Sequence, residues 1–323
     1  MDKRGNNMSI SELKEIQKRV IKKNKTINYI FSILTAIVLL PVIIQKIYTL
    51  INNNTYLQMP FFISSFIQLT FIIVFILIIF IFTKNIFLAK DTAIFNKNYK
   101  QLFVLDALKQ MFEDLKYDSN QKFIDNDFDK YKILYQGDSN SSNDSITGKY
   151  KNIKFEQEDI HIEKKEEYKD SDGDTKERWV TIFLGRWMNY DFNKDFKTNV
   201  IVCDSIFYTG SWNYKKVKME DEEFNKIFRV YAENEHEAFY ILTPHFMEKL
   251  KKIKETFNCP ITFGFIDSKL YIALNNNEDS FEYNILKPIN EEEVRENILK
   301  DIKVITDFVD ELNLDNDLFK KGV

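Results

Sequence analysis

Apolar residues are concentrated in two long runs near the start of the chain. One run covers residues 61–82 and ends in Phe71–Phe82 (FIIVFILIIFIF), which has no polar side chain. As a helix, its 22 residues would extend about 33 Å, enough to cross a bilayer core of about 30 Å. The other run covers residues 27–47 and has Tyr29 and Tyr48 near its ends, where membrane proteins place aromatic residues. We expect a transmembrane hairpin over residues 27–82, with spans at about 27–47 and 61–82.

The alternative is a buried helical hairpin in the core of a soluble protein. Soluble helices of this length keep a polar face, and neither run has one. A cleaved signal peptide does not fit either, because the first run is too long and begins too late in the chain. The lipid bilayer is therefore the first partner that the sequence predicts.

Positive charge flanks the predicted hairpin on one side only. Eight basic residues precede Ile27, at positions 3, 4, 14, 18, 19, 22, 23 and 25, and four lysines follow the second run, at positions 84, 90, 97 and 100. The connection Tyr48–Pro60 (YTLINNNTYLQMP) has no charged residue. Because basic flanks stay on the cytoplasmic side, we expect a multi-pass protein of the cell membrane with both termini in the cytoplasm.

Residues 1–26 are predicted to form a basic cytoplasmic N-terminal helix. Ser9 and Glu12 have the spacing of a capping box. An apolar helix face follows, formed by Leu13, Ile16, Val20 and Ile21. The basic residues orient the hairpin, and this amphipathic helix could in addition bind anionic lipid.

Helical spacing of apolar residues continues beyond the second run. We expect a juxtamembrane helix over residues 83–118 and a cytoplasmic α+β domain over residues 119–323. Residues 136–148 (QGDSNSSNDSITG) have the composition of a loop. Beyond them, β-branched and aromatic residues predict strands at 150–157, 159–165, 178–192 and 198–204, with the polar segment 169–177 (KDSDGDTKE) as a hairpin tip. These strands predict an antiparallel sheet.

The C-terminal part mixes strands and helices. We expect strands at 224–232, 238–242, 259–267 and 269–275, and residues 281–286 could form another. Thr243 and Pro244 predict the start of one helix, and Asn290 followed by three glutamates predicts the start of another. The second helix has an apolar stripe formed by Val294, Ile298, Ile302, Ile305, Val309 and Leu312. The predicted fold is α+β, a two-helix transmembrane hairpin followed by an antiparallel β-sheet with flanking helices.

Five segments in this order bear a family resemblance: GKYKNIKFEQEDIHIE, TIFLGRWMNYDFNKDF, DEEFNKIFRVYAENEHEAFYILTPHFMEKL, ITFGFIDSKLYIAL and ILKDIKVITDFVDELNL. From about Lys100 to Leu314 the chain resembles the bacterial membrane protein family known as domain of unknown function 3137. The resemblance implies a fold and an N-terminal transmembrane pair. It supplies no activity, cofactor or site residue.

Composition excludes some functions. A net charge of −4 and a pI near 5.7, with acids and bases interleaved, argue against a nucleic-acid binder. The two cysteines, Cys203 and Cys259, lack the spacing of a zinc site and do not indicate a disulfide scaffold. This cysteine usage is typical of a reducing compartment.

Few motifs indicate chemistry. The segment Asp170–Thr175 (DSDGDT) invites comparison with a calcium loop, but Gly173 and Thr181 occupy its fourth and twelfth positions, whereas an EF-hand needs Gly at the sixth and Glu at the twelfth. The histidines, His161, His236 and His245, have no catalytic or metal-binding spacing. No phosphate-binding glycine motif occurs. We therefore expect no cofactor and no metal, and catalytic residues stay unknown.

Two classes of function remain open. The first is a membrane-anchored interaction or regulatory module with an unidentified protein partner. The second is a membrane-tethered enzyme of an unrecognised type with its site in the β-rich domain. A deep cleft around Arg186, Asp191 or Asp195 would indicate the enzyme. The lack of a reaction motif favours the module.

The three tryptophans bear on the same choice. Trp179, Trp187 and Trp212 lie in the predicted sheet region and could line a ligand surface. Packing in the core of a small sheet domain is the more common role of such residues. We expect the larger share of them to be core residues.

Overall fold

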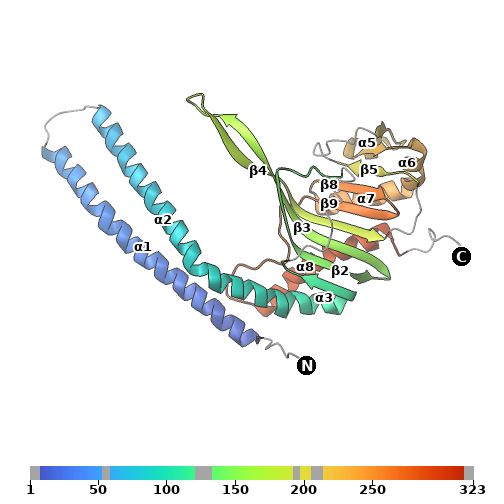
Figure 1. The fold of residues 1–323 in the computed structure, drawn as a ribbon, viewed down its shortest axis with the longest axis horizontal. Coiled ribbons are helices and arrows are strands. Elements are labelled where there is room, and N and C mark those ends of the chain that lie inside the picture. The colour runs from blue at the N-terminus through green and yellow to red at the C-terminus, as the bar shows by residue number, and fades with distance from the viewer. Residues whose placement is uncertain (1–7, 53–58, 121–132, 192–196, 205–213, 316–323) are drawn as a thin grey trace. The chain divides into compact units, whose positions relative to one another are not determined.

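The computed structural model describes residues 8–52, 59–120, 133–191, 197–204 and 214–315 (Figure 1). Contacts divide the chain into two compact units. The first, here called the hairpin unit, consists of Met1–Leu102 with Tyr283–Asn290. The second, here called the sheet unit, consists of Phe103–Glu282 with Glu291–Val323. The segment Tyr283–Asn290, which joins the hairpin unit from far along the chain, is called the strap.

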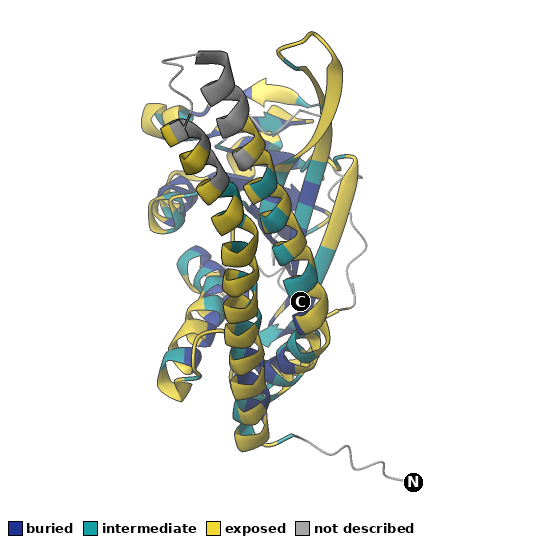
Figure 2. Cartoon of the chain, turned by 90° about the vertical axis from the view of Figure 1, so that its left-hand side faces the viewer, coloured by how far each residue is buried: buried dark blue, intermediate teal, exposed yellow. Residues whose placement is uncertain are grey.

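Two long helices form most of the hairpin unit, α1 (Ile10–Asn52) and α2 (Met59–Tyr99). They lie side by side (Figure 1), with the rings of Phe31 and Phe80 centred 4.5 Å apart and Lys23 Nζ 2.5 Å from Asp91 Oδ2. Both helices are long and apolar enough to cross a membrane, and no residue of the most apolar window of either is buried (Figure 2). Both predicted runs lie within these helices, whereas residues 53–58 of the predicted connection lie outside the described residues.

The N-terminal end of α1 has the predicted capping box. The Ser9 amide donates to Glu12 Oε2 at 2.7 Å, and the Glu12 amide donates back to Ser9 Oγ at 3.2 Å. These hydrogen bonds lower the pKa of Glu12. Of the four residues in the apolar face that we considered for lipid binding, Leu13, Ile16 and Val20 are buried and Ile21 is half-buried. That face is therefore used for packing within the protein.

The strap is held to the hairpin by one side chain of α1. Gln17 is only 3% exposed, and its Nε2 donates to the carbonyl oxygens of Ile285 at 3.1 Å and Lys287 at 2.6 Å. Its Oε1 accepts the amide of Ile289 at 3.0 Å. A buried amide side chain is thereby satisfied on both its atoms, as burial requires.

Aromatic residues reinforce this attachment. The ring of Tyr283 stacks on Tyr99 of α2 with centroids 5.2 Å apart, and Phe95 lies 6.2 Å from the same ring. The Tyr283 hydroxyl donates to the carbonyl oxygens of Lys287 and Pro288, both at 3.0 Å. The strap is thus a folded segment with its own internal hydrogen bonds.

The helix after α2 changes geometry and then ends. A π-helical turn, η1 (Lys100–Val104), leads into α3 (Leu105–Met111), and β1 (Glu113–Asp118) follows. The prediction of a helix over residues 83–118 is therefore wrong at its C-terminal end, because the helix ends at Met111 and residues 113–118 form a strand. Phe112 is extended and Asp114 has a left-handed φ of 49°, which helical backbone cannot contain.

In the part of the chain that the structure describes, nine strands form one antiparallel sheet in the order β1-β2-β3-β4-β9-β8-β5-β7-β6. The predicted α+β class is confirmed. The remaining strands are β2 (Ser139–Tyr150), β3 (Ile153–Lys169), β4 (Thr175–Asp191), β5 (Val200–Cys203), β6 (Lys215–Val217), β7 (Arg229–Ala232), β8 (Ile261–Ile266) and β9 (Lys269–Leu274). The accompanying helices are α5 (Glu222–Ile227), α6 (Glu235–Ile241), α7 (Pro244–Phe257) and α8 (Glu291–Leu312).

Helices α7 and α8 cover one face of the sheet. The hydroxyl of Tyr190 on β4 donates to the carbonyl of Ile305 on α8 at 2.9 Å, and Phe246 on α7 meets Phe265 on β8 edge to face. All six residues of the predicted α8 stripe are buried. Thr243 caps α7 as predicted, accepting the amide of Phe246 at 3.3 Å.

The opposite face has its own apolar cluster around Trp187, which is fully buried. Ile133 packs there over Gly264, where an added Cβ would approach Ile133 Cδ1 to 2.6 Å. The missing side chain of Gly264 therefore makes room for this contact. Of the two tryptophans that the structure describes, Trp187 is a core residue and Trp179 is 52% exposed, while Trp212 lies outside the described residues.

Strands β3 and β4 continue beyond the sheet as a two-stranded ribbon. Pairing with β2 stops at Glu163 and pairing with β9 begins only at Arg186, so residues 164–180, here called the arm, pair only with each other among the described residues. Figure 1 shows this ribbon extending away from the remaining strands. Its tip at Asp170–Asp174 is the predicted hairpin turn, closed by the Gly173 amide bonding to the Asp170 carbonyl at 3.1 Å.

Local composition misled the prediction at β2. Residues 136–148 were expected to be a loop, but Ser139–Tyr150 pairs with both β1 and β3. Pairing with two neighbours outweighs the low β-propensity of Ser, Asn and Asp. The expected strands at 150–157 and 159–165 both belong to β3, which begins after a turn at Lys151–Asn152.

Helix caps explain two further errors. Residues 238–241 belong to helix α6 and Leu242 is its C-cap, because Asn234 starts this helix by accepting the His236 amide at 3.0 Å. The first half of the expected strand 224–232 is helix α5, whose cap Asp221 accepts the amides of Glu223 and Phe224, both at 2.9 Å. Both caps follow the known preference for Asn and Asp.

Residues 281–286 form no strand in the structure. Phe281 has a left-handed φ of 59°, and the residues from Tyr283 onward belong to the strap. The other predicted hairpin is confirmed, since β8 and β9 are joined by Asp267 and Ser268, both with positive φ. Two successive left-handed residues are typical of a tight hairpin turn.

Replacing Gln17 by Ala is expected to release the strap. The change removes three hydrogen bonds and leaves backbone groups of Ile285, Lys287 and Ile289 without the Gln17 side chain as partner. Each of these groups that stays buried would destabilise the attached strap by about 1–3 kcal/mol. Hydrogen exchange at the Ile289 amide should become at least tenfold faster.

The matched control is Lys18→Ala, an exposed neighbour on the same helix. Exchange at Ile289 should be unchanged in this variant. Equal protection of Ile289 in the Gln17→Ala variant and the wild type would show that the side chain does not hold the strap.

Candidate functional site

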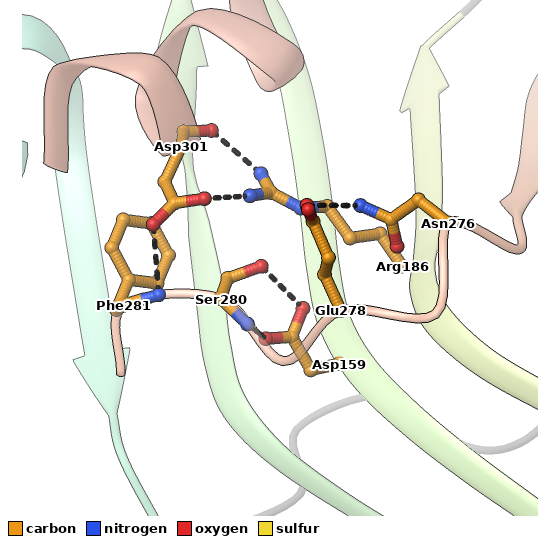
Figure 3. A network of polar contacts seen from close by, with 7 residues as sticks. All are labelled: Asp159, Arg186, Asn276, Glu278, Ser280, Phe281 and Asp301. Atoms are coloured by element: carbon orange, nitrogen blue, oxygen red, sulfur yellow. Dashed lines mark hydrogen bonds and ion pairs between the residues drawn. The ribbon is translucent and has the colours of Figure 1, made fainter. Parts of the chain in front are cut away.

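A buried arginine lies at the centre of a polar network in the sheet unit (Figure 3). Arg186 on β4 is 1% exposed, and its guanidinium meets Asp301 on α8 twice. Nη1 donates to the Asp301 carbonyl oxygen at 2.6 Å and Nη2 donates to Oδ1 at 2.5 Å. The planar guanidinium suits such a forked contact. The Asp301 side chain is 26% exposed, whereas Arg186 is buried, so loss of Asp301 would leave an uncompensated charge inside the fold.

The loop between β9 and α8 is fastened to this network. The second oxygen of Asp301 accepts the Phe281 amide at 2.9 Å, and the Phe281 ring lies under the guanidinium at 5.8 Å. Next to it, Asp159 of β3 accepts the Ser280 amide at 2.5 Å and the Ser280 hydroxyl at 2.9 Å. Two carboxylates therefore fix two consecutive residues of one loop.

This loop continues directly into the strap. Ser280 and Phe281 are held inside the sheet unit, and Tyr283, two residues later, is held inside the hairpin unit. The chain returns to the sheet unit at Glu291, where α8 begins. The strap is thus preceded by a loop that contacts the Arg186 network, and it is followed by α8, the helix that carries Asp301.

The network places a carboxyl group in an unusual environment. Burial raises the pKa of Asp159 well above its ordinary value, the nearby Asp144 carboxylate acts in the same direction, and Arg186 and the Ser280 amide oppose them. Burial and Asp144 also raise the pKa of Tyr117, whose hydroxyl donates to Asp144 Oδ1 at 2.5 Å. Asp159 is the group whose protonation the fold favours most clearly.

An acidic cluster lies close by. One carboxylate oxygen from each of Asp144, Asp279 and Glu282 lies within 4.8 Å of the others. Asp144 is buried, whereas Asp279 and Glu282 are exposed. The amide of Asn143 bridges Asp144 and Asp279 through contacts of 3.1 and 2.9 Å. Exposed acidic groups of this kind are common on protein surfaces.

An open polar groove of about 560 Å³ lies over the opposite end of the central strands. Its walls include Asp114, Lys149 and Asp191. Lys149 pairs with Asp114 at 2.5 Å, which raises the pKa of the lysine and lowers that of the aspartate. These shifts favour the charged forms, the opposite of what a general acid or base near neutral pH needs.

The structure separates the residues that sequence reasoning linked to an enzyme. Arg186 is enclosed by the network above, Asp191 lies on the wall of the open groove, and Asp195 lies outside the described residues. At 1% exposure, the Arg186 side chain does not reach an open surface. The arginine is a structural anchor in this arrangement.

The histidines also lie apart. His161 is half-buried on β3 with Nε2 2.8 Å from Thr181 Oγ1, while His236 and His245 are exposed at the starts of α6 and α7. Ile160 and Ile162, the neighbours of His161, are buried as the alternation predicted. The structure brings these three side chains into no common site.

The hairpin tip uses its acidic residue internally. Asp170 Oδ1 accepts the amides of Asp172 and Asp174, both at 3.0 Å, and Oδ2 pairs with Lys176 at 2.5 Å. These contacts lower the pKa of Asp170. The Asp170 carboxylate, which would be the first ligand of a calcium loop, is therefore already engaged by contacts within the turn.

Both cysteines are free thiols. Burial raises the pKa of Cys203 to about 12 and that of Cys259 to about 11. Because the thiolate is the reactive form, neither is an efficient nucleophile at neutral pH. Their environments fit packing better than catalysis.

Sequence reasoning missed the residues that hold the loop and the strap: Gln17, Asp159, Ser280 and Asp301. Gln17 interrupts the apolar face of α1, and Asp301 flanks the apolar stripe of α8, so a polar residue on a buried face was the available signal. Their partners lie far away in sequence, 268 residues for Gln17 and Ile285 and 121 residues for Asp159 and Ser280. Periodicity could not identify such pairs.

Replacing Asp159 by Asn is expected to change how stability depends on pH. An acid with a raised pKa in the folded state binds its proton more tightly there, so its contribution to stability is present at low pH and falls as pH rises toward the folded pKa. The free energy of unfolding of the wild type should therefore decline above about pH 4, by at most about 1.4 kcal/mol per pH unit from this group.

Asn can still accept the Ser280 amide and contact its hydroxyl, so the variant should fold and lose this part of the slope. Denaturant titrations of the full chain between pH 4 and 8, followed by tryptophan fluorescence, measure the difference. Asp172→Asn at the exposed tip is the control. Parallel curves for wild type and Asp159→Asn would contradict the raised pKa.

Comparisons with known proteins give one match. Residues 181–314 match the family model described as "Protein of unknown function (DUF3137)". Neither the comparison with curated proteins nor the one with solved structures finds a match. The matched segment includes Arg186, Ser280 and Asp301, and it is shorter than the resemblance from about Lys100 that the sequence suggested. Residues 181–314 are therefore similar to the domain that this family model describes.

Proposed function

We propose that the chain is an integral membrane protein that presents its sheet unit to the cytoplasm as an interaction module. The observation behind this is the apolar surface of α1 and α2. Between residues 67 and 82 alone, ten large apolar side chains are exposed: Ile67, Phe71, Ile73, Val74, Phe75, Leu77, Ile78, Ile79, Ile81 and Phe82.

The free energy of leaving this surface in water supports a bilayer as its surroundings. Burying one such side chain fully contributes about 1.5–3 kcal/mol. With the side chains about half exposed, the ten residues on α2 represent on the order of 10 kcal/mol, similar to the whole net stability of a typical domain. The matching surface of α1 adds a similar amount. A bilayer removes this cost for both helices.

Charge supports the orientation. The basic residues of the described chain from Lys14 to Lys25 and from Lys84 to Lys100 lie toward one end of the helix pair, and α1 ends and α2 begins at the other end. The positive-inside rule then assigns the basic end, both termini and the sheet unit to the cytoplasm. The two cysteines are free thiols, which is also typical of proteins in a reducing compartment such as the cytoplasm.

The arm supports an interaction role. Trp179 is 52% exposed and Tyr168 is 42% exposed, on a ribbon whose two strands, among the described residues, pair with no further strand. Arg178 lies over the Tyr168 ring at 5.7 Å and pairs with Glu166 at 3.2 Å. Tyr, Trp and Arg are enriched at protein interfaces. A protruding ribbon with such residues is better suited to binding a protein partner than to forming a substrate pocket.

Cysteine labelling in intact cells tests the orientation. Cys203 and Cys259 are poor reporters, because their raised pKa values leave about a thousandfold and a hundredfold less thiolate than an ordinary cysteine has. We therefore propose Asp172→Cys at the exposed arm tip and Asn53→Cys in the predicted connection. An impermeant thiol reagent should label the second variant in intact cells and the first only after lysis. Labelling of the first variant from outside would overturn the cytoplasmic assignment.

The same arm variant tests the interaction role. A cleavable crosslinker on the introduced thiol should give one discrete adduct in membranes, with Glu255→Cys on α7 as the control for position. A reproducible adduct formed from the arm alone supports the module. An adduct pattern that is the same from both positions would contradict a role for the arm.

A further inference from the structure

A small pocket lies between α1 and α2 within the hairpin unit. Its volume is about 290 Å³, and it is lined by Arg19, Lys22, Lys23, Thr26, Ile27 and Phe87. The five α1 residues are spaced at i, i+3, i+4, i+7 and i+8, which places them on one helix face. Phe87 supplies the opposite wall from α2. Three cations therefore share one concave surface with apolar side chains.

The charges of this pocket are arranged unevenly. Lys23 is paired with Asp91 on α2 at 2.5 Å, which ties the two helices together at the pocket. Within the described residues, neither Arg19 nor Lys22 forms an ion pair, and both side chains are exposed. The pocket thus offers two uncompensated positive charges on a fixed helix pair.

The level of the pocket matches the headgroup layer of a bilayer. Lys23 precedes the first apolar run by four residues and Phe87 follows the second by five, which at 1.5 Å per residue is about 6–8 Å from the end of each run. The polar layer on each side of the hydrocarbon core is about 5–8 Å thick. Phe87 is 67% exposed and Ile27 begins the apolar run, so both can contact an acyl chain.

We propose that this pocket binds the phosphate headgroup of one anionic lipid, with Arg19 and Lys22 on the phosphate and Phe87 and Ile27 against the first carbons of an acyl chain. The proposal rests on the membrane insertion proposed above. It replaces the broader expectation that the apolar face of the N-terminal helix binds lipid, because Leu13, Ile16 and Val20 are buried. Basic pockets between helices at the cytoplasmic boundary are suited to such headgroups.

Lipid retention by the full chain tests this site. The protein, purified in detergent, is mixed with equal amounts of dioleoyl phosphatidylglycerol and dioleoyl phosphatidylcholine, and bound lipids are counted by native mass spectrometry. Wild type should retain one phosphatidylglycerol. Each basic residue near a membrane surface contributes about a factor of five to binding, so Arg19→Gln with Lys22→Gln should weaken retention roughly 30-fold.

The control has the same charge change at other exposed positions of α1, Lys18→Gln with Lys25→Gln. Equal loss in both double variants would show attraction to net charge and no site. Retention unaffected in the pocket variant would also overturn the proposal, as would displacement of the lipid by an equal concentration of inorganic phosphate, which indicates a soluble ligand. If wild type retained no phosphatidylglycerol while still inserting into membranes, the lipid site would be wrong and the proposed membrane anchoring would be unaffected.

Discussion

The exposed apolar surface of α1 and α2 is the constraint on which the other features depend. Two helices of 43 and 41 residues expose aliphatic and aromatic side chains along the stretches without charge, and their backbone groups are satisfied internally. Only helices and closed barrels meet that second condition inside lipid. Near the point where the apolar surface stops, the Lys23–Asp91 pair ties the two helices together. Farther along α1, Gln17 holds the strap and the capping box closes the end of the helix.

The strap gives the hairpin unit a second set of covalent connections to the sheet unit. The chain passes from α2 through η1 into the sheet unit, and it returns to the hairpin through residues 283–290. On one side of this return, Asp159 and Asp301 fix Ser280 and Phe281, and on the other Gln17 fixes Ile285, Lys287 and Ile289. Side chains therefore fix the chain both just before the strap and within it.

Much of the fold could be predicted from sequence because its signals are local. The apolar runs, the Ser9–Glu12 cap, the Thr243 cap and the α8 stripe each lie within one helix. The prediction was wrong at β2, whose polar sequence becomes a strand only through pairing with β1 and β3. The candidate site could not be predicted, because Gln17, Asp159 and Asp301 act through partners on distant segments. Arg186 was noted from sequence as a marker of a cleft, and the structure shows a closed ion pair instead.

Alkaline carbonate extraction of membranes from cells that express the full chain tests the anchoring claim most directly. The account predicts that the protein stays in the membrane pellet and is released only by detergent. A variant with Ile37, Val38, Ile78 and Ile79 all replaced by Asp should lose this retention, because charge within both apolar stretches opposes insertion. Release of the unmodified chain into the carbonate supernatant as a monodisperse protein would contradict the account.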